Sequence, residues 1–376
     1  MRQTCYQINL NPQLGGGEIY TRFFGEALLA LGWEVVTVVS REAPFWDRLM
    51  APGARFLKVG STAEMFEQLP SQSALIVTHT VADVPTATRL AERHVLTGFA
   101  HMPLFERNPP GFALYHRIFA VSQHVLDSLR WRGYANAYPE PLYGVADVAR
   151  GDPKAMLGSR SSYDWDRRKF RDRLMGVTEP LWNGLFPKRL FQKRQGLTLG
   201  IVSRLTPIKQ LPLIFELLAP VLKRFPQVNL EIFGNGGYAS VRDLRHSLKP
   251  IASQVRFWGY QENVAAVYGS LDFVLSGLPE KEALGLNLIE AQCCGTPVLA
   301  VRAPPFTETV VEGKGGFFFT DPREDAGADF ERLLARLLGG IAFPRPQAGA
   351  EYLEKFHFER FRERVQGALQ AVEVAA

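Results

Sequence analysis

Two successive sets of short apolar runs organise the chain, and helical patterns separate the runs within each set. The first set is Thr4–Leu10, Glu34–Ser40, Ala74–Val77, Val95–Ala100 and Ile118–Val121. The second set is Leu197–Val202, Asn229–Phe233, Val255–Trp258, Phe273–Ser276 and Pro297–Val301. Amphipathic stretches at Glu18–Leu31 and Leu211–Phe225 are typical of the intervening helices. This alternation predicts parallel sheets covered on both faces, so we expect an α/β protein with two Rossmann-like domains facing across a cleft.

The length of 376 residues leaves room for two domains, because single cores seldom grow beyond roughly 250–300 residues. We place an N-terminal domain at residues 1–195, including a connector at about 150–195, and a C-terminal domain at 196–350. The last segment, 351–376, carries apolar residues at mostly helical spacing and predicts a C-terminal helix.

The connector interrupts the strand and helix pattern and is strongly basic. Residues 150–196 hold twelve Lys or Arg and five Asp or Glu, a local charge of +7 where the whole chain carries +5. A solvated, charged linker is the simpler interpretation. The alternative is a basic surface that meets an anionic acceptor or the cytoplasmic face of a membrane.

Cysteine content and hydropathy bear on the compartment. The chain has three cysteines, of which Cys293 and Cys294 are adjacent, and their spacing matches neither a disulfide framework nor a zinc site. No apolar run reaches the roughly 18–20 residues that span a bilayer. Polar residues and a glycine triplet interrupt the N-terminus early, unlike a signal peptide. We therefore expect a cytoplasmic protein.

The stretch EALGLNLIEAQCCGTP at 282–297 carries the densest chemical information. It places Glu282 and Glu290 on either side of a glycine-containing turn that opens a short helix, which Gly295 ends. Free N–H groups at a helix N-terminus suit a phosphate, and Glu290 can accept hydrogen bonds from sugar hydroxyls of the same ligand. The pattern suggests a site for a sugar attached to a phosphate. Two ordinary surface carboxylates are the alternative.

Two cations follow the first strand of the second set, in SRLTPIKQ at 203–210. Arg204 and Lys209 would lie at the carboxyl end of that strand, beside the expected cleft. A planar guanidinium and a compact ammonium suit a diphosphate, particularly one that gains charge as it leaves. Two solvated loop cations would give the same pattern.

In the N-terminal domain, three features lie at strand ends. Gly15-Gly16-Gly17 stands where a backbone can approach a phosphate, although Tyr20 replaces the third glycine of a dinucleotide fingerprint. A plain tight turn explains the triplet equally well. His101 and His79 each close a strand. We assign a role in the site to His101, whose neutral imidazole can hydrogen-bond a sugar hydroxyl, and a structural role to His79.

We predict no metal site. Asp164-Trp165-Asp166 has a form that holds divalent cations, but the neighbouring Arg160, Arg167, Arg168 and Lys169 would compete with a metal. Seven histidines are scattered without ligand spacing, and no Gly-x-Ser-x-Gly elbow supports a Ser-His-Asp triad.

Taken together, these residues resemble the retaining glycosyltransferases of the GT-B fold, family 4. EALGLNLIEA at 282–291 with CGTPV at 294–298 is similar to the family's E-x7-E signature, and Ser203-Arg204-Leu with Lys209 to its donor-phosphate pair. GGGE at 15–18 and AHMP at 100–103 are similar to its glycine loop and histidine segment. The resemblance covers nearly the whole chain apart from about 150–196.

The resemblance implies a role for each matched residue. Arg204 and Lys209 would neutralise the diphosphate as the glycosidic bond breaks, His101 would lie beside the reacting sugar, and Glu282 would contact donor-sugar hydroxyls. The implied donor-binding residues are Gly16 at the phosphates, Gly285 and Leu286 at the sugar and phosphate, Glu290 at the ribose, and Glu308 in the same pocket.

The resemblance also implies transfer from a nucleotide-diphosphate sugar with retention, without a metal or other cofactor, and a C-terminal helix that packs back on the N-terminal domain. As acceptor we expect a saccharide or lipid-linked precursor in cell-envelope polysaccharide or glycolipid synthesis, and no nucleic acid. The basic connector adds the expectation of peripheral contact with the inner face of an anionic membrane. Three alternatives stay open: a GT-B-like sugar-nucleotide epimerase, an oxidoreductase that uses the glycine loop, and a non-catalytic sugar-nucleotide-binding protein.

Overall fold

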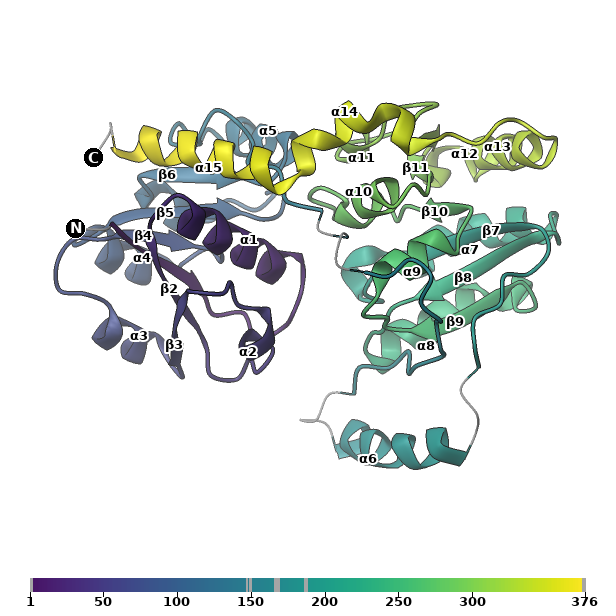
Figure 1. Cartoon of the computed structure of the whole chain (residues 1–376), viewed down its shortest axis with the longest axis horizontal. Coiled ribbons are helices and arrows are strands. Elements are labelled where there is room, and N and C mark those ends of the chain that lie inside the picture. The colour runs from purple at the N-terminus through teal and green to yellow at the C-terminus, as the bar shows by residue number, and fades with distance from the viewer. Residues whose placement is uncertain (1–2, 147, 149–150, 166–169, 186–188, 374–376) are drawn as a thin grey trace. The chain divides into compact units, whose positions relative to one another are not determined.

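The computed structural model describes residues 3–146, 148, 151–165, 170–185 and 189–373, which form two compact units. The first unit comprises Met1–Ala146 and Glu354–Ala376, and the second comprises Asp147–Leu353. Each unit holds a six-stranded sheet of parallel strands flanked by helices (Figure 1). The predicted α/β class with two Rossmann-like domains is confirmed.

The sheet of the first unit has the order β3-β2-β1-β4-β5-β6. Its strands are Thr4–Asn9 (β1), Glu34–Ser40 (β2), Arg55–Val59 (β3), Leu75–Thr78 (β4), Val95–Ala100 (β5) and Arg117–Ala120 (β6). Its helices are Gly16–Ala30 (α1), Trp46–Leu49 (α2), Thr62–Gln68 (α3), Val84–Ala91 (α4), Gln123–Trp131 (α5) and Phe358–Glu373 (α15). The central strands are almost wholly buried runs, because helices cover both faces of a parallel sheet.

Side chains at the helix starts explain several of these boundaries. Ser61, Asp83 and Ser122 each accept a hydrogen bond from the backbone N–H three residues further on, which caps α3, α4 and α5. Gly32 ends α1 in the left-handed region, at a φ of 87°.

The C-terminal segment is broken, where the sequence predicts one continuous helix. Ala350–Leu353 (α14) closes the second unit, the 3₁₀ turn Glu354–Phe356 follows, and α15 belongs to the first unit. Helix α15 packs against α1, and the ring of Phe361 meets that of Tyr20 edge-on at 5.3 Å between centroids. The chain therefore returns to the first unit after completing the second.

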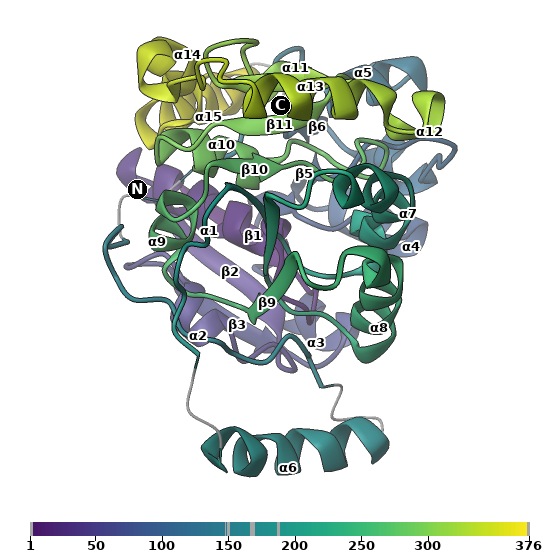
Figure 2. The same ribbon diagram turned by 90° about the vertical axis from the view of Figure 1, so that its right-hand side faces the viewer.

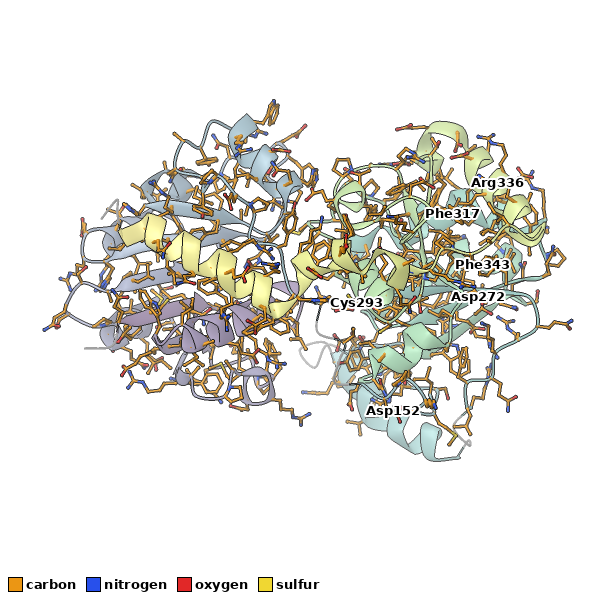
Figure 3. All side chains as sticks on the ribbon, turned by 45° about the horizontal axis from the view of Figure 1, so that its top comes forward. Asp152, Asp272, Cys293, Phe317, Arg336 and Phe343 are labelled. Atoms are coloured by element: carbon orange, nitrogen blue, oxygen red, sulfur yellow. The ribbon has the colours of Figure 1, made fainter. Side chains whose placement is uncertain are left out.

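The sheet of the second unit has the order β12-β11-β10-β7-β8-β9. Its strands are Leu197–Val202 (β7), Val228–Phe233 (β8), Val255–Gly259 (β9), Phe273–Leu275 (β10), Val298–Val301 (β11) and Gly316–Phe319 (β12). Its helices, besides α14, are Phe170–Leu185 (α6), Leu211–Lys223 (α7), Tyr238–Ser247 (α8), Val264–Gly269 (α9), Leu286–Cys293 (α10), Phe306–Thr309 (α11), Pro322–Asp325 (α12) and Ala328–Leu338 (α13). Phe343, labelled in Figure 3, follows α13 in the chain. Its ring meets that of Phe273 edge-on at 4.8 Å between centroids.

The described part of the connector lies in the second unit, which differs from the predicted boundary near residue 195. Arg160 N donates to Trp258 O at 2.9 Å, and Asp164 N donates to Gly236 O at 2.8 Å. Phe191 N donates to Leu157 O, so the connector residues before α6 also pair with those after it. The connector is basic in composition, but its backbone hydrogen bonds attach it to the β9 side of the second sheet.

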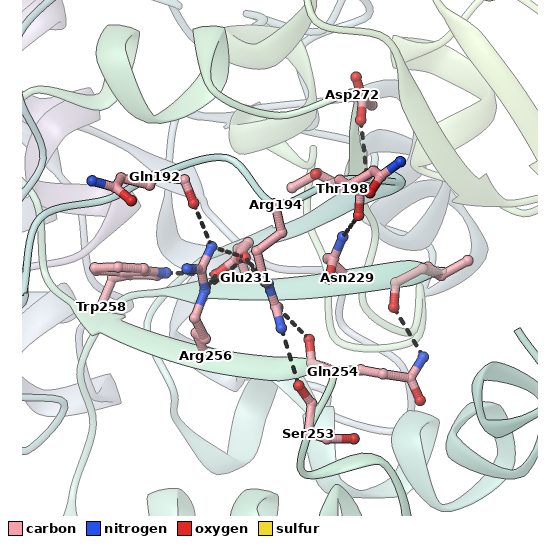
Figure 4. A network of polar contacts seen from close by, with 12 residues as sticks. Gln192, Arg194, Thr198, Asn229, Glu231, Ser253, Gln254, Arg256, Trp258 and Asp272 are labelled. Atoms are coloured by element: carbon pink, nitrogen blue, oxygen red, sulfur yellow. Dashed lines mark hydrogen bonds and ion pairs between the residues drawn. The ribbon is translucent and has the colours of Figure 1, made fainter. Parts of the chain in front are cut away.

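A buried carboxylate anchors the end of the connector. Glu231 on β8 has no exposed surface and forms ion pairs with Arg194 of the connector at 3.1 Å and with Arg256 of β9 (Figure 4). Trp258 Nε1 donates a third contact to Glu231 at 2.7 Å. Two cations and an indole N–H satisfy the buried charge, so Arg194 has a structural partner inside the unit.

Candidate functional site

The order in which strands are added to the second sheet reverses between β7 and β10. From β7 the chain adds β8 and β9 on one side, then β10, β11 and β12 on the other. Ligands of parallel α/β sheets bind at the carboxyl ends of the strands at such a switch point. A small pocket lies there, lined by Ile201, Ser203, Lys209, Leu211, Leu275, Ser276, Gly277, Glu282, Asn287 and Phe306.

Two of the predicted catalytic residues meet in this pocket. Lys209 ends a 3₁₀ turn after β7, and its Nζ lies 2.6 Å from Oε2 of Glu282. Both side chains are partly buried, which strengthens their attraction relative to a fully exposed pair. Glu282 thereby holds the ammonium at the strand ends, and the remaining Nζ–H donors suit an anionic ligand.

The first turn of α10 borders the same pocket. Gly285 precedes it with a φ of 76°, and a Cβ at this position would lie 3.1 Å from the ring of Phe306. Asn287 Nδ2 donates to Val202 O at 3.1 Å, which ties the helix start to the end of β7. Leu286 and Asn287 open the helix, so their N–H groups have no acceptor one turn earlier and suit a phosphate or sugar oxygen, whereas Leu288 N donates to Gly285 O at 2.9 Å.

Glu290 lies one turn further along α10 and has a partner that sequence reasoning missed. Tyr268 of α9 donates its hydroxyl to Glu290 Oε2 at 2.7 Å. Burial, together with the adjacent Glu290 carboxylate, raises the pKa of Tyr268 well above 10, so the hydroxyl stays protonated and remains a donor. The contact orients the carboxylate on the helix.

Arg204 and Glu308 lie close in sequence to pocket-lining residues but are not among them. Arg204 follows the pocket-lining Ser203, and its side chain is exposed. Glu308 lies on α11 two residues after Phe306, and its carbonyl accepts a hydrogen bond from Tyr352. The structure thus brings Lys209, Glu282 and the start of α10 together, with Arg204 and Glu308 on the adjoining segments.

In the first unit, His101 belongs to a hydrogen-bonded row of side chains. His79 Nε2 lies 2.9 Å from Gln7 Oε1, and His79 Nδ1 lies 3.2 Å from His101 Nε2. The rings of His79, His101 and Phe99 contact one another, with centroids 5.4 Å apart for His79 and His101, 5.1 Å for His79 and Phe99, and 5.6 Å for Phe99 and His101. Gln7, on β1, is a partner that the sequence did not indicate.

The direction of these hydrogen bonds fixes the imidazole tautomers. The Gln7 oxygen only accepts, so His79 carries its proton on Nε2 and accepts on Nδ1 from His101 Nε2–H. Burial lowers the pKa of His101 to about 4, and burial with the adjacent His101 lowers that of His79 well below 6.5. Both rings are therefore neutral at pH 7, and Nδ1 of His101 keeps a lone pair.

The glycine triplet differs from the predicted turn. Helix α1 begins at Gly16, so Gly16 and Gly17 lie in its first turn, with Gly15 as the preceding cap residue. A Cβ on Gly17 would lie 3.9 Å from the imidazole of His101. The loop and the histidine are therefore neighbours. His79, for which the sequence suggested a structural role, is held between Gln7 and His101 by hydrogen bonds.

The Asp164-Trp165-Asp166 motif yields no metal group in the described structure, and Asp166 lies outside the described residues. Trp165 stacks on Tyr163 at 4.8 Å between ring centroids. Within the residues that the structure covers, no three His, Cys, Asp or Glu side chains gather as a metal-binding group. In the same residues, none of the helices has both the length and the apolar character that crossing a bilayer requires.

The fold is shared with known sugar-nucleotide proteins. The structure of Anabaena HepE in complex with UDP-glucose superimposes with a TM-score of 0.67 at 16% identity, covering 98% of this chain and 100% of that one. At 16% identity this similarity shows that the two proteins share a fold.

Residues 186–337 match the model of the family described as glycosyl transferases group 1. The D-inositol 3-phosphate glycosyltransferase of Corynebacterium urealyticum is 29% identical over 171 residues, which is 41% of this chain and 39% of that protein. The phosphatidyl-myo-inositol mannosyltransferase of Mycobacterium tuberculosis (H37Rv) is 30% identical over 149 residues, 38% of this chain and 39% of that protein. The chain thus spans about two fifths of the length of these curated relatives.

Proposed function

We propose that this protein is a glycosyltransferase that moves a sugar from a nucleotide-diphosphate sugar to an acceptor with retention of configuration. The observation that carries the proposal is the Lys209–Glu282 pair beside the start of α10, at the switch point of the second sheet. This site lies inside the segment that matches glycosyl transferases group 1. The UDP-glucose in the similar HepE structure supports the same donor class.

The donor binds to the second unit in this proposal. Glu290, held by Tyr268, accepts hydrogen bonds from the ribose, and Glu308 belongs to α11, the helix that contributes Phe306 to the pocket. The backbone N–H groups around Gly285 and Leu286 bind the sugar and the adjoining phosphate. Glu282 contacts the hydroxyls of the transferred sugar.

Bond cleavage places negative charge on the leaving diphosphate, and Lys209 and Arg204 stabilise it. The bond between the anomeric carbon and the β-phosphate oxygen breaks while the acceptor oxygen bonds to the same carbon from the same face. The acceptor's proton passes to the departing phosphate oxygen. This route needs no metal, and we propose none.

The first unit supplies His101 and the start of α1 at Gly16. The Nδ1 lone pair of a neutral His101 accepts a hydrogen bond from a sugar hydroxyl, and the backbone at Gly16 approaches the phosphates. As acceptor we propose a saccharide or lipid-linked precursor of the cell envelope, used in the cytoplasm next to the membrane. The phosphatidyl-inositol acceptor named for the Mycobacterium relative supports a lipid-linked class.

Ligand-induced thermal shifts test the donor site. We expect one nucleoside diphosphate among UDP, GDP and ADP, and its sugar conjugate, to raise the melting temperature of the wild type but not of Glu290→Ala. Stabilisation by NAD alone, or by no nucleotide, would refute the donor assignment. Product analysis without an acceptor then separates a transferase from an epimerase, because only the epimerase converts the donor by itself.

The role of Lys209 is tested by kinetics. Lys209→Ala should lower kcat by roughly a hundredfold or more and raise KM far less, because the ammonium acts on charge that develops in the transition state. Lys223→Ala, at an exposed lysine on the helix that follows, serves as the control. Equal losses in kcat and in affinity would contradict the proposed role.

A further inference from the structure

Helix α6, at residues Phe170–Leu185, exposes an apolar stripe. Phe170, Leu174 and Val177 are 74%, 56% and 66% exposed. Their spacing of four and then three residues places them on one side of the helix. In two perpendicular views α6 lies apart from the sheet of its own unit (Figures 1 and 2). Three adjacent apolar side chains in solvent are unusual in the absence of a partner.

The opposite side of α6 makes the contact with the unit. A Cβ on Gly176 would lie 3.3 Å from Trp165, and Asp172 on the same side is buried. Trp165 stacks on Tyr163, whose ring faces that of Tyr238 on α8 at 5.9 Å. The helix therefore packs through small and polar residues, and its apolar stripe faces away from that contact.

Positive charge accompanies the stripe. Residues 166–173 hold five Lys or Arg and two Asp, and Lys188 and Arg189 follow the helix in sequence. The exposed Arg173 guanidinium lies 5.6 Å from the ring of Phe170, at the edge of the stripe. Two connector cations outside this stretch have acidic partners within the unit, since Arg160 pairs with Glu262 and Lys193 with Asp272. In the sequence, most of the connector's Lys and Arg residues fall at the start of α6 and next to its ends.

We propose that α6 is an interfacial helix that docks this protein on an anionic lipid bilayer. A helix with Phe and Leu on one side and cations beside them lies in the plane of the membrane, with its apolar stripe among the acyl chains and its cations at the headgroups. The proposal rests on the proposed function, because a lipid-linked acceptor is presented at such a surface, and it names the element that makes the contact.

Flotation with vesicles tests this proposal on the full chain. We expect the wild type to float with vesicles of equal parts phosphatidylglycerol and phosphatidylcholine, and not with phosphatidylcholine alone or at high salt. The triple variant Phe170→Ser, Leu174→Ser, Val177→Ser should lose roughly tenfold or more of the partition coefficient. Trp131→Ser is a matched control, because Trp131 is also 74% exposed and Arg132 lies over its ring.

Further measurements distinguish a lipid bilayer from the other possible partners of the stripe. They also distinguish this proposal from that of the donor site. No flotation of the wild type, or equal losses in the triple variant and in Trp131→Ser, would overturn the role of α6. A wild-type dimer that the triple variant converts to monomer in sedimentation would assign the stripe to a second copy instead. A lowered melting temperature of the triple variant would assign the stripe to a contact within the chain. Nucleotide-induced thermal shifts of the same variants report on the donor site, so that either proposal can fail without the other.

Discussion

Acidification should destabilise the first unit through His101. The folded protein holds the pKa of this imidazole at about 4, whereas an unfolded histidine titrates near 6.5. Between these values the unfolded chain binds a proton that the folded one excludes. The contribution of His101 to stability is therefore intact above about pH 6.5 and is lost as the pH falls toward 4.

The magnitude follows from the two pKa values. At about pH 5, the difference between 6.5 and about 4 corresponds to about 2 kcal/mol of lost unfolding free energy, against almost none at about pH 7.5. Glutamine does not titrate, and its amide can still donate to His79 Nδ1. His101→Gln should therefore lose about 2 kcal/mol less than the wild type over the same pH interval.

Urea-dependent hydrogen exchange provides the assay, because it reports the unfolding free energy of β4 and β5 separately from that of the second unit. His357→Gln, at an exposed histidine of the C-terminal segment, is the control and should behave like the wild type. The wild type and His101→Gln could instead lose the same unfolding free energy between about pH 7.5 and about pH 5. That result would refute the assignment of a neutral, buried His101 hydrogen-bonded to His79.

Three further substitutions test contacts in the second unit. Gly285→Ala should cost about 1–3 kcal/mol of unfolding free energy, measured by urea denaturation, because it combines a φ of 76° with a Cβ 3.1 Å from Phe306. Tyr268→Phe should weaken nucleotide binding roughly tenfold in calorimetry, because Glu290 loses the hydroxyl that orients it. Glu231→Gln should cost about 3–5 kcal/mol in urea denaturation, because it leaves two cations without their buried anion.

Each of these has a matched control in the same unit. Gly237→Ala places a Cβ in open space, so a loss equal to that of Gly285→Ala would rule out the steric explanation. Tyr260→Phe, at an exposed ring, should leave nucleotide affinity unchanged. Asp243→Asn breaks the exposed pair with Arg242 and should change stability little, so a similarly small effect of Glu231→Gln would contradict the burial argument.

Burial explains which strands the sequence predicted. The central strands of both sheets are mostly buried, β7 and β8 on nearly every residue, and their boundaries fall within one residue of the prediction. The two strands that the pattern missed, Arg55–Val59 (β3) and Gly316–Phe319 (β12), are edge strands. An edge strand is covered less completely, so β3 contains polar and exposed residues and lacks a continuous apolar run. This reason does not apply to β12, a short Gly-Phe-Phe-Phe run that is largely buried.

The candidate site was predictable only where its residues stand next to a recognisable strand end. Lys209 follows β7, and Glu282 precedes the turn into α10, so both could be placed from sequence. The partner of Glu290 could not, because Tyr268 lies on another helix and its hydroxyl has no sequence signal. Gln7 is likewise a β1 residue whose role depends on the pairing of β1 with β4.

Gly17 and Gly285 show that a glycine motif can be interpreted only when the backbone conformation around it is known. A Cβ on Gly17 would meet His101 at 3.9 Å, an ordinary contact, and α1 continues through this residue in a right-handed helix. At Gly285 both the positive φ and the ring of Phe306 disfavour a side chain. The glycine of the second unit is thus required to bring α10 up to the ends of β7 and β10, where Lys209 and Glu282 meet. The similarity at 282–291 therefore constrains the shape of the pocket itself, whereas the triplet at 15–17 constrains only the space beside His101.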